Sequence, residues 1–151
     1  MNVLDQIYER LEVDAKCHAK LQELFQQFVQ RGAESSDKNP LPGLKLEKQL
    51  DKDYFEAVFL GRRHRFSFSV FRDSAGALKG RVEVNLVDRE GATGISIGEF
   101  DFDEAGETSL KSYKNDAVED FNGLGPFYII LGYIHDSLSG RDPVMVNIKA
   151  S

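Results

Sequence analysis

The spacing of hydrophobic residues changes twice along the chain, and each change marks a different kind of secondary structure. From residue 3 to about residue 30, apolar side chains recur every three or four positions, which is the period of an α-helix. The stripe is formed mainly by Leu4, Ile7, Leu11, Leu21, Phe25 and Phe28. We predict an N-terminal helical region over residues 1–31, with a stop at Gly32.

The helical stripe is interrupted where Asp14 and His18 occupy positions that would extend it. Two explanations stay open. Either the helix breaks near residues 13–14, with Asp14 capping a second piece, or the helix leaves the core at that point. We expect one helix, long or kinked. Residues 32–53 are rich in turn-forming residues and are predicted to be a connection, with a candidate edge strand at residues 44–47.

Between residues 54 and 112 the period shortens to two, which is typical of half-buried strands. Phe66, Phe68 and Val70 alternate with polar residues, and residues 81–87 repeat the pattern. Residues 54–60 are apolar on both faces apart from Glu56, which predicts a central strand covered on both sides. With turns between these segments, the pattern predicts an antiparallel meander of about four to six strands.

A change of phase within residues 93–103 predicts an irregularity in one strand. Ile95 and Ile97 are odd-numbered, whereas Phe100 and Phe102 are even-numbered. A β-bulge at Gly98 would place all four side chains on the core face. Glu99, Asp101 and Asp103 would then form an exposed acidic row.

After Tyr113 the helical period returns, and we predict that residues 113–140 are helical. Asp116 to Glu119 resemble a capping box, and Gly125 with Pro126 predicts the start of a final helix that Gly140 ends. The predicted buried face of this helix consists of Phe127, Ile130, Leu131, Ile134 and Leu138. Residues 141–151 form a tail or a short strand. The chain is thus predicted to be one α+β domain over residues 1–151, with the last helix packed on the sheet.

Composition and charge restrict the class of function. The 151 residues include one cysteine, so no internal disulfide can form, and we expect a reducing, cytoplasmic location in a bacterial cell. The start of the chain lacks the pattern of a signal peptide, and no apolar run approaches the length of a membrane span. The formal net charge of −6 disfavours general binding to nucleic acids or anionic lipids.

The sequence contains no recognisable catalytic or metal-binding motif. Asp101 and Asp103 begin like a calcium loop, but later ligand positions hold Ala105 and Ser112, and we expect neither metal nor cofactor. Cys17 and His18 are neighbours on a helix and cannot pair, so a buried thiol is expected. His135 is expected to be an ordinary residue near a helix end.

Arg62, Arg63, His64 and Arg65 form the one notable basic cluster. It would suit an anion or a nucleic-acid strand, but the net charge favours local neutralisation of Arg65 and Arg81 by acidic residues on adjacent strands. Separated positive and negative patches would also suit a protein partner, which makes Arg62, Arg63, Arg65, Glu99, Asp101 and Asp103 the candidate partner-binding residues.

These observations favour a small, acidic, non-catalytic protein-binding module of the inhibitor, immunity-protein or chaperone type. Two alternatives remain: an enzyme with an acid or base in a cleft between sheet and helix, and an anion or nucleic-acid binder that uses residues 62–65. The sequence does not indicate the oligomeric state.

Overall fold

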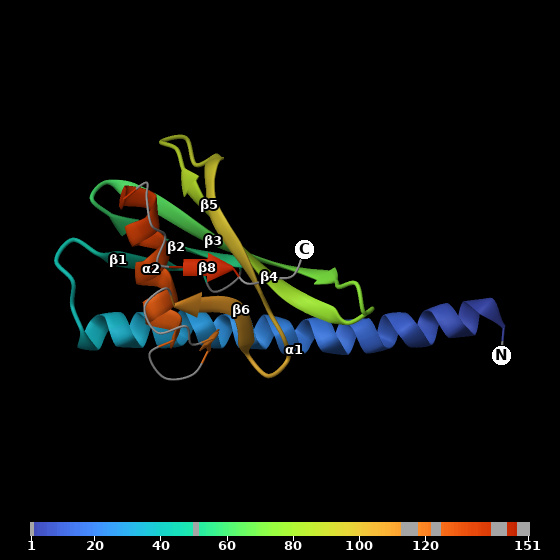
Figure 1. Cartoon of the computed structure of the whole chain (residues 1–151). Coiled ribbons are helices and arrows are strands. Elements are labelled where there is room, and N and C mark those ends of the chain that lie inside the picture. Colours follow the sequence, from blue (N-terminus) through green and yellow to red (C-terminus); the bar gives the residue numbers. More distant parts are fainter. Residues whose placement is uncertain (1, 50–51, 113–117, 122–124, 140–144, 148–151) are drawn as a thin grey trace.

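The computed structural model describes residues 2–49, 52–112, 118–121, 125–139 and 145–147 and confirms the α+β class. A long N-terminal helix precedes a run of antiparallel strands and a second helix (Figure 1). In chain order the elements are α1 (Val3–Lys38), β1 (Lys45–Lys48), β2 (Tyr54–Phe59), β3 (Arg62–Arg72), β4 (Leu78–Val87), β5 (Thr93–Phe102), β6 (Glu107–Ser112), β7 (Val118–Asp120), α2 (Gly125–Ser139) and β8 (Met145–Asn147).

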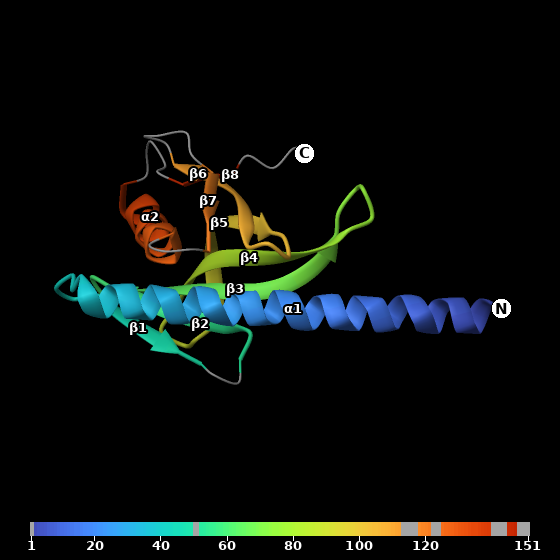
Figure 2. The same cartoon turned by 90° about the horizontal axis from the view of Figure 1, so that it is seen from below.

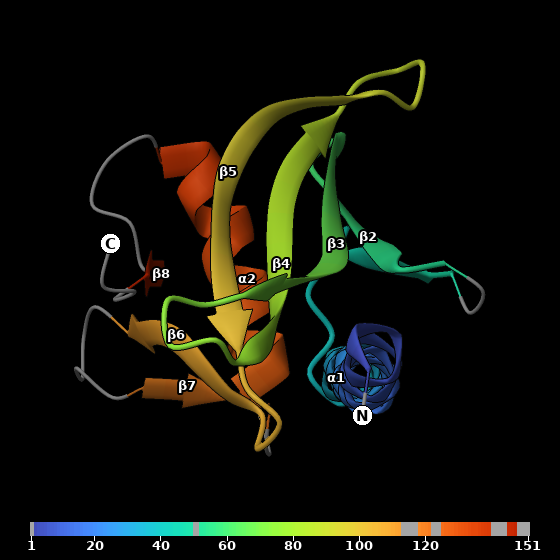
Figure 3. The same cartoon turned by 90° about the vertical axis from the view of Figure 1, so that its right-hand side faces the viewer.

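The strands form an antiparallel meander in which β1 to β7 lie in sequence order and β8 pairs with β6. The predicted edge strand at residues 44–47 is confirmed as β1. β2 is paired on both edges, as predicted. On its outer face, Arg63 and Arg65 donate to Glu56, and among the described elements both helices lie on the other face (Figure 3).

The sheet curls around the two helices, so that α1 and α2 lie on its concave side (Figure 3). Phenylalanine rings from α1 and from several strands fill this concave side. Phe28 of α1 is fully buried and has four phenylalanine rings from other elements within 6.5 Å, measured between ring centroids. Those rings belong to Phe55, Phe66, Phe100 and Phe121. Phe28 therefore ties α1 to the centre of the sheet.

The prediction that α1 ends at Gly32 is wrong, because the helix continues to Lys38. Gly32 is buried, and a Cβ atom there would lie 2.6 Å from Cδ1 of Ile130 in α2. The glycine thus allows the two helices to approach closely and does not stop the helix. The stop comes at Asn39, whose backbone and side-chain amides both donate to the carbonyl of Ser35, just before Pro40.

The N-terminal third of α1 is not part of the core, although Leu4, Ile7 and Leu11 were predicted to share one stripe with the core residues. All residues from 2 to 13 are exposed, and burial begins near Asp14. An unbroken helix of 36 residues is about 54 Å long, and only its later turns pack against the sheet. The helix therefore extends beyond the sheet (Figures 1 and 2), and the second of the two explanations for the interruption is correct.

The predicted irregularity in β5 is confirmed next to Gly98. Val84 pairs with Gly98 and Asn85 pairs with Ser96, so Ile97 is the extra residue. A Cβ atom at Gly98 would lie 3.0 Å from the ring of Tyr133, which explains the glycine. Ile95 does not reach the core face, because a second shift follows in the register and leaves this side chain 71% exposed.

The C-terminal part differs from the predicted helical stretch over residues 113–140. Residues 118–120, which were predicted to be helical, form the strand β7 because they pair with β6. α2 begins at Gly125, as predicted. Its buried face differs from the predicted one, since Leu138 is exposed whereas Ile129 and Tyr133 are buried. The difference arises because α2 contacts both the sheet and α1. Residues 116–117 of the predicted capping box and Gly140 lie outside the described residues. Among the helices described, none is both long and apolar enough to span a membrane.

Candidate functional site

Residues 2–13, which are the N-cap and the first turns of α1 and are here called the projecting segment, carry an apolar stripe whose side chains are at least half exposed. Leu4, Ile7, Tyr8 and Leu11 follow the spacing i, i+3, i+4 and i+7, which places them on one face of the helix. Their exposed fractions are 69%, 50%, 64% and 60%. Isolated exposed apolar residues are ordinary, but four in one stripe form a candidate interaction surface.

A helix cap stabilises the start of the projecting segment, and contacts with the sheet fix its base. At its start, the side chain of Asn2 accepts the amide hydrogen of Asp5 at 2.8 Å, which caps the helix. At its base, Asp14 forms an ion pair with Arg72 of β3 at 2.7 Å, and the ring of His18 lies 5.9 Å from that of Phe68. The sheet thus fixes the direction in which the stripe points.

Cys17 lies at the same base, where its thiol is next to a carboxylate. Its Sγ is 2.8 Å from a carboxylate oxygen of Glu104, in the turn between β5 and β6. Burial and the hydrogen bond to Glu104 raise the pKa of the Cys17 thiol to about 11. Because the thiolate is the reactive form, a thiol that stays protonated at neutral pH has a structural role.

The basic cluster of the sequence does not form a basic patch. Strand alternation sends Arg63 and Arg65 to the outer face of the sheet and His64 into the core. Arg63 donates to both Glu47 and Glu56, which lie directly opposite each other on β1 and β2, and Arg65 donates to Glu56 at 2.9 Å. Two facing carboxylates would repel each other, so these arginines neutralise them.

Arg65 was predicted to be neutralised by Glu83 and the row Glu99, Asp101 and Asp103, but its partner is Glu56. The predicted exposed acidic row is only partly exposed. Glu99 is exposed, but Asp101 is buried and accepts a hydrogen bond from Arg81 at 2.9 Å. Asp103 closes the turn after β5 by accepting the amides of Ala105 and Glu107. The expected local neutralisation is thus confirmed for Arg81, which also lies 3.9 Å from Glu99.

Arg62 and His64 hold the C-terminal end of α2. Arg62 donates to the backbone carbonyl of Ser137 at 2.7 Å. His64 is fully buried, with Nδ1 3.1 Å from the carbonyl of Ala57 and Nε2 2.7 Å from the hydroxyl of Ser137. Since a carbonyl only accepts, Nδ1 carries the proton in neutral His64, and the Ser137 hydroxyl beside Nε2 also lies 2.7 Å from the carbonyl of Ile134, to which it can donate. Burial lowers the pKa of His64, which favours this neutral state.

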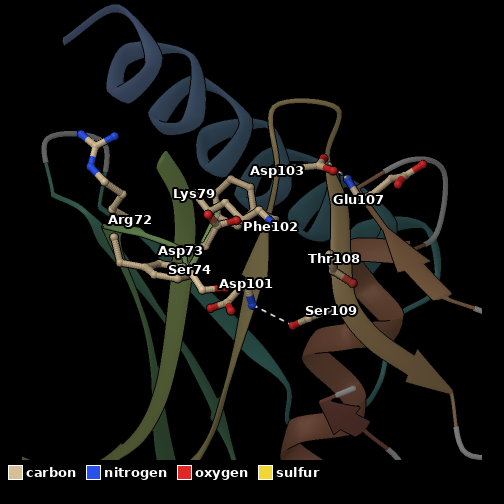
Figure 4. A pocket seen from close by; sticks show the side chains of 11 residues that line it. Arg72, Asp73, Ser74, Lys79, Asp101, Phe102, Asp103, Glu107, Thr108 and Ser109 are labelled. Atoms are coloured by element: carbon tan, nitrogen blue, oxygen red, sulfur yellow. Dashed lines mark hydrogen bonds and ion pairs between the residues drawn. The ribbon is translucent and has the colours of Figure 1, made fainter. Parts of the chain in front are cut away.

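A pocket of about 770 Å³ opens between the β3–β4 hairpin and the β5–β6 hairpin (Figure 4). β5 and β6 share one registered pair, Phe102 with Thr108, and the amide of Asp101 donates instead to the hydroxyl of Ser109. Carboxylates line one wall and Lys79 lies on the other. Several of the charged groups have partners within the protein: Lys79 lies 3.4 Å from Asp73, and Asp101 accepts a hydrogen bond from Arg81.

Within the described ranges, no three His, Cys, Asp or Glu side chains gather as a metal-binding set. Comparisons with models of known protein families, with curated proteins and with solved structures found no significant match to this chain. Function is therefore inferred from geometry alone.

Sequence reasoning placed the candidate site on the charged outer face of the sheet and assigned the stripe of the projecting segment to the core. The interruption at Asp14 and His18 was the available signal for the stripe. It marks the place where α1 leaves the sheet, beyond which the apolar side chains are exposed with respect to the described residues.

Proposed function

We propose that this protein is a non-catalytic binding module that engages another protein through the apolar stripe of the projecting segment. The observation that carries this proposal is the exposure of Leu4, Ile7, Tyr8 and Leu11 on a helix that the fold itself holds in place. Anchors at i, i+3, i+4 and i+7 are the pattern by which amphipathic helices enter grooves of partner proteins.

Preorganisation supports the same proposal. A free helix of about twelve residues is only marginally stable in water, so a disordered segment would lose affinity when it ordered on binding. The projecting segment avoids this loss because it continues a helix whose later turns are buried with Leu21, Phe25 and Phe28. The stripe can therefore bind without a folding step.

The two alternative functions have less support. Arg62, Arg63 and Arg65 each donate a hydrogen bond to a group of the protein, so binding of nucleic acid would have to compete with those contacts. His64 and Asp101 are buried but engaged by Ser137 and Arg81. The single cysteine and the net charge of −6 support a cytoplasmic location and a protein partner for the module.

Affinity capture from native host cells tests the proposal. We compare the natural protein with Ile7→Asp and with Val13→Asp as a matched control, because Val13 is 65% exposed but lies on the opposite face of the helix. We expect a stoichiometric partner with the natural protein and with Val13→Asp, and its loss with Ile7→Asp. Equal capture by all three proteins would refute the role of the stripe.

A further inference from the structure

The charges that flank the apolar stripe differ on its two sides. At 100° per residue, Asp5 and Glu12 lie on the same flank because they are seven positions apart, and Glu9 lies further round the same side. Arg10 lies on the opposite flank. Residues 2–13 carry three acidic side chains and one basic side chain, so the surface around the stripe is acidic.

From this charge distribution we infer that the partner presents an apolar groove with a rim of lysine or arginine side chains against the Asp5 and Glu12 flank. This inference rests on the proposed function and names the chemistry of its partner. Complementary charges at the rim of an interface steer association and select the partner, while the apolar anchors supply most of the affinity. The groove needs a length of about 10 Å to accept the four side chains from Leu4 to Leu11.

A second copy of the chain fits the stripe less well. In an antiparallel pair, the twofold rotation keeps equivalent flanks on one side, so Asp5 of one copy would face the acidic flank with Glu12 of the other. A parallel pair would bring two chains with a formal net charge of −6 side by side. Like charges face each other in the antiparallel pair, whereas in the parallel pair the acidic flank of one copy would face the Arg10 flank of the other and only the net charges of the two chains would repel.

A lipid surface fits less well for a related reason. Helices that lie in membrane interfaces carry lysine and arginine on the polar face, which anionic headgroups attract. Asp5, Glu9 and Glu12 would instead be repelled by those headgroups.

A pair of designed helical proteins provides the probe. Both have the same leucine-lined open groove, with a rim of lysines in one and of glutamates in the other, and binding to the full chain is measured by fluorescence anisotropy. We expect the lysine-rimmed groove to bind at least tenfold more tightly. We also expect Ile7→Asp to abolish binding, Val13→Asp to leave it unchanged, and the double variant Asp5→Lys, Glu12→Lys to reverse the preference.

Several outcomes would overturn the inference. Equal affinity for the two grooves, or binding to neither, would show that the basic rim is wrong, while capture that depends on Ile7 would still uphold the proposed function. Sedimentation of the natural protein as a dimer that Ile7→Asp dissociates would identify a second copy as the occupant. Binding to phosphatidylcholine–phosphatidylserine vesicles that Ile7→Asp abolishes would identify a lipid surface.

Discussion

The thiol of Cys17 lies at the point where α1 leaves the sheet, and its surroundings keep it protonated. Burial comes first among the causes that raise its pKa to about 11, followed by the hydrogen bond to Glu104 and the charge of that carboxylate. The structural role of Cys17 therefore depends on the turn between β5 and β6 as well as on α1.

Replacement of Glu104 by glutamine should make Cys17 more reactive. Glu104→Gln removes the negative charge and preserves the size of the side chain, so the pKa of the thiol falls and more thiolate is present at pH 8. We predict a several-fold faster alkylation by iodoacetamide, followed by mass spectrometry. Glu107→Gln is the control, since Glu107 is exposed and is not among the groups that shift this pKa. An unchanged rate in Glu104→Gln would contradict the described contact.

His64 should make the stability of the protein depend on pH. Its pKa is lowered in the folded state by burial, whereas in the unfolded chain it titrates near about 6.5. As the pH falls through about 6.5 the unfolded chain takes up a proton that the folded protein resists, so stability falls. The contribution of neutral His64 is therefore complete above this pH and is progressively lost below it, until the lower folded pKa is passed.

Chemical denaturation between pH 7 and pH 5 measures this effect. We predict that the free energy of unfolding declines less steeply over this range in His64→Gln than in the natural protein. His135→Gln serves as the control because His135 is exposed at the end of α2. Parallel pH profiles for the natural protein and His64→Gln would show that His64 is not held neutral by the fold.

At the scale of elements, α1 consists of two parts with different roles. Its later turns bury Phe25 and Phe28 against the sheet, and its first turns carry the stripe outside the sheet. The same amphipathic pattern therefore serves folding in one part and, in our proposal, binding in the other.

Substitutions in the two parts should differ in their cost to stability. We predict that Phe28→Ala destabilises the protein by about 3–5 kcal/mol, because it leaves a cavity among four other aromatic rings. Ile7→Asp should change the free energy of unfolding by no more than about 0.5 kcal/mol, because the Ile7 side chain is 50% exposed and lies outside the buried core. Urea denaturation of both variants tests this, and a large loss in Ile7→Asp would place the first turns of α1 in the core.

The strands could be predicted from the sequence because alternation is a local property. Phe66 and Phe68 face the core, and the polar residues between them face outward, as the two-residue period requires. The end of α1 could not be predicted from Gly32, because the close approach that needs a glycine involves Ile130, about a hundred residues away. Glycine has several uses, and only tertiary contacts distinguish them.

The candidate site was harder to predict than the fold. Leu4 to Leu11 and Leu21 to Phe28 follow the same period, and a hydrophobic stripe indicates an apolar contact without indicating whether the contact lies in the same chain. The arginine cluster led to the opposite error, because it was predicted to contact a partner and instead contacts the same chain. Neighbours in sequence point to opposite faces of a strand, and the partner of Arg65, Glu56, depends on the pairing of β2 with β3.

At the scale of the whole molecule, the curled sheet encloses the later turns of α1 and leaves its N-terminal end outside (Figure 2). The sheet thus supports the later turns of α1, and the contacts of Asp14 and Cys17 fix the helix at the point where it extends beyond the sheet. A partner can approach the stripe without displacing any described element.

Site-specific photocrosslinking in native host cells tests the central claim most directly. A photoreactive benzoylphenylalanine replaces Tyr8 in the stripe or, in a separate variant, Val13 on the opposite face of the same helix. We predict that the Tyr8 variant yields one dominant adduct with another protein on irradiation, and that the Val13 variant yields little or none. Equal adducts at both positions, no adduct at Tyr8, or an adduct with the mass of two copies of this chain would contradict the proposal.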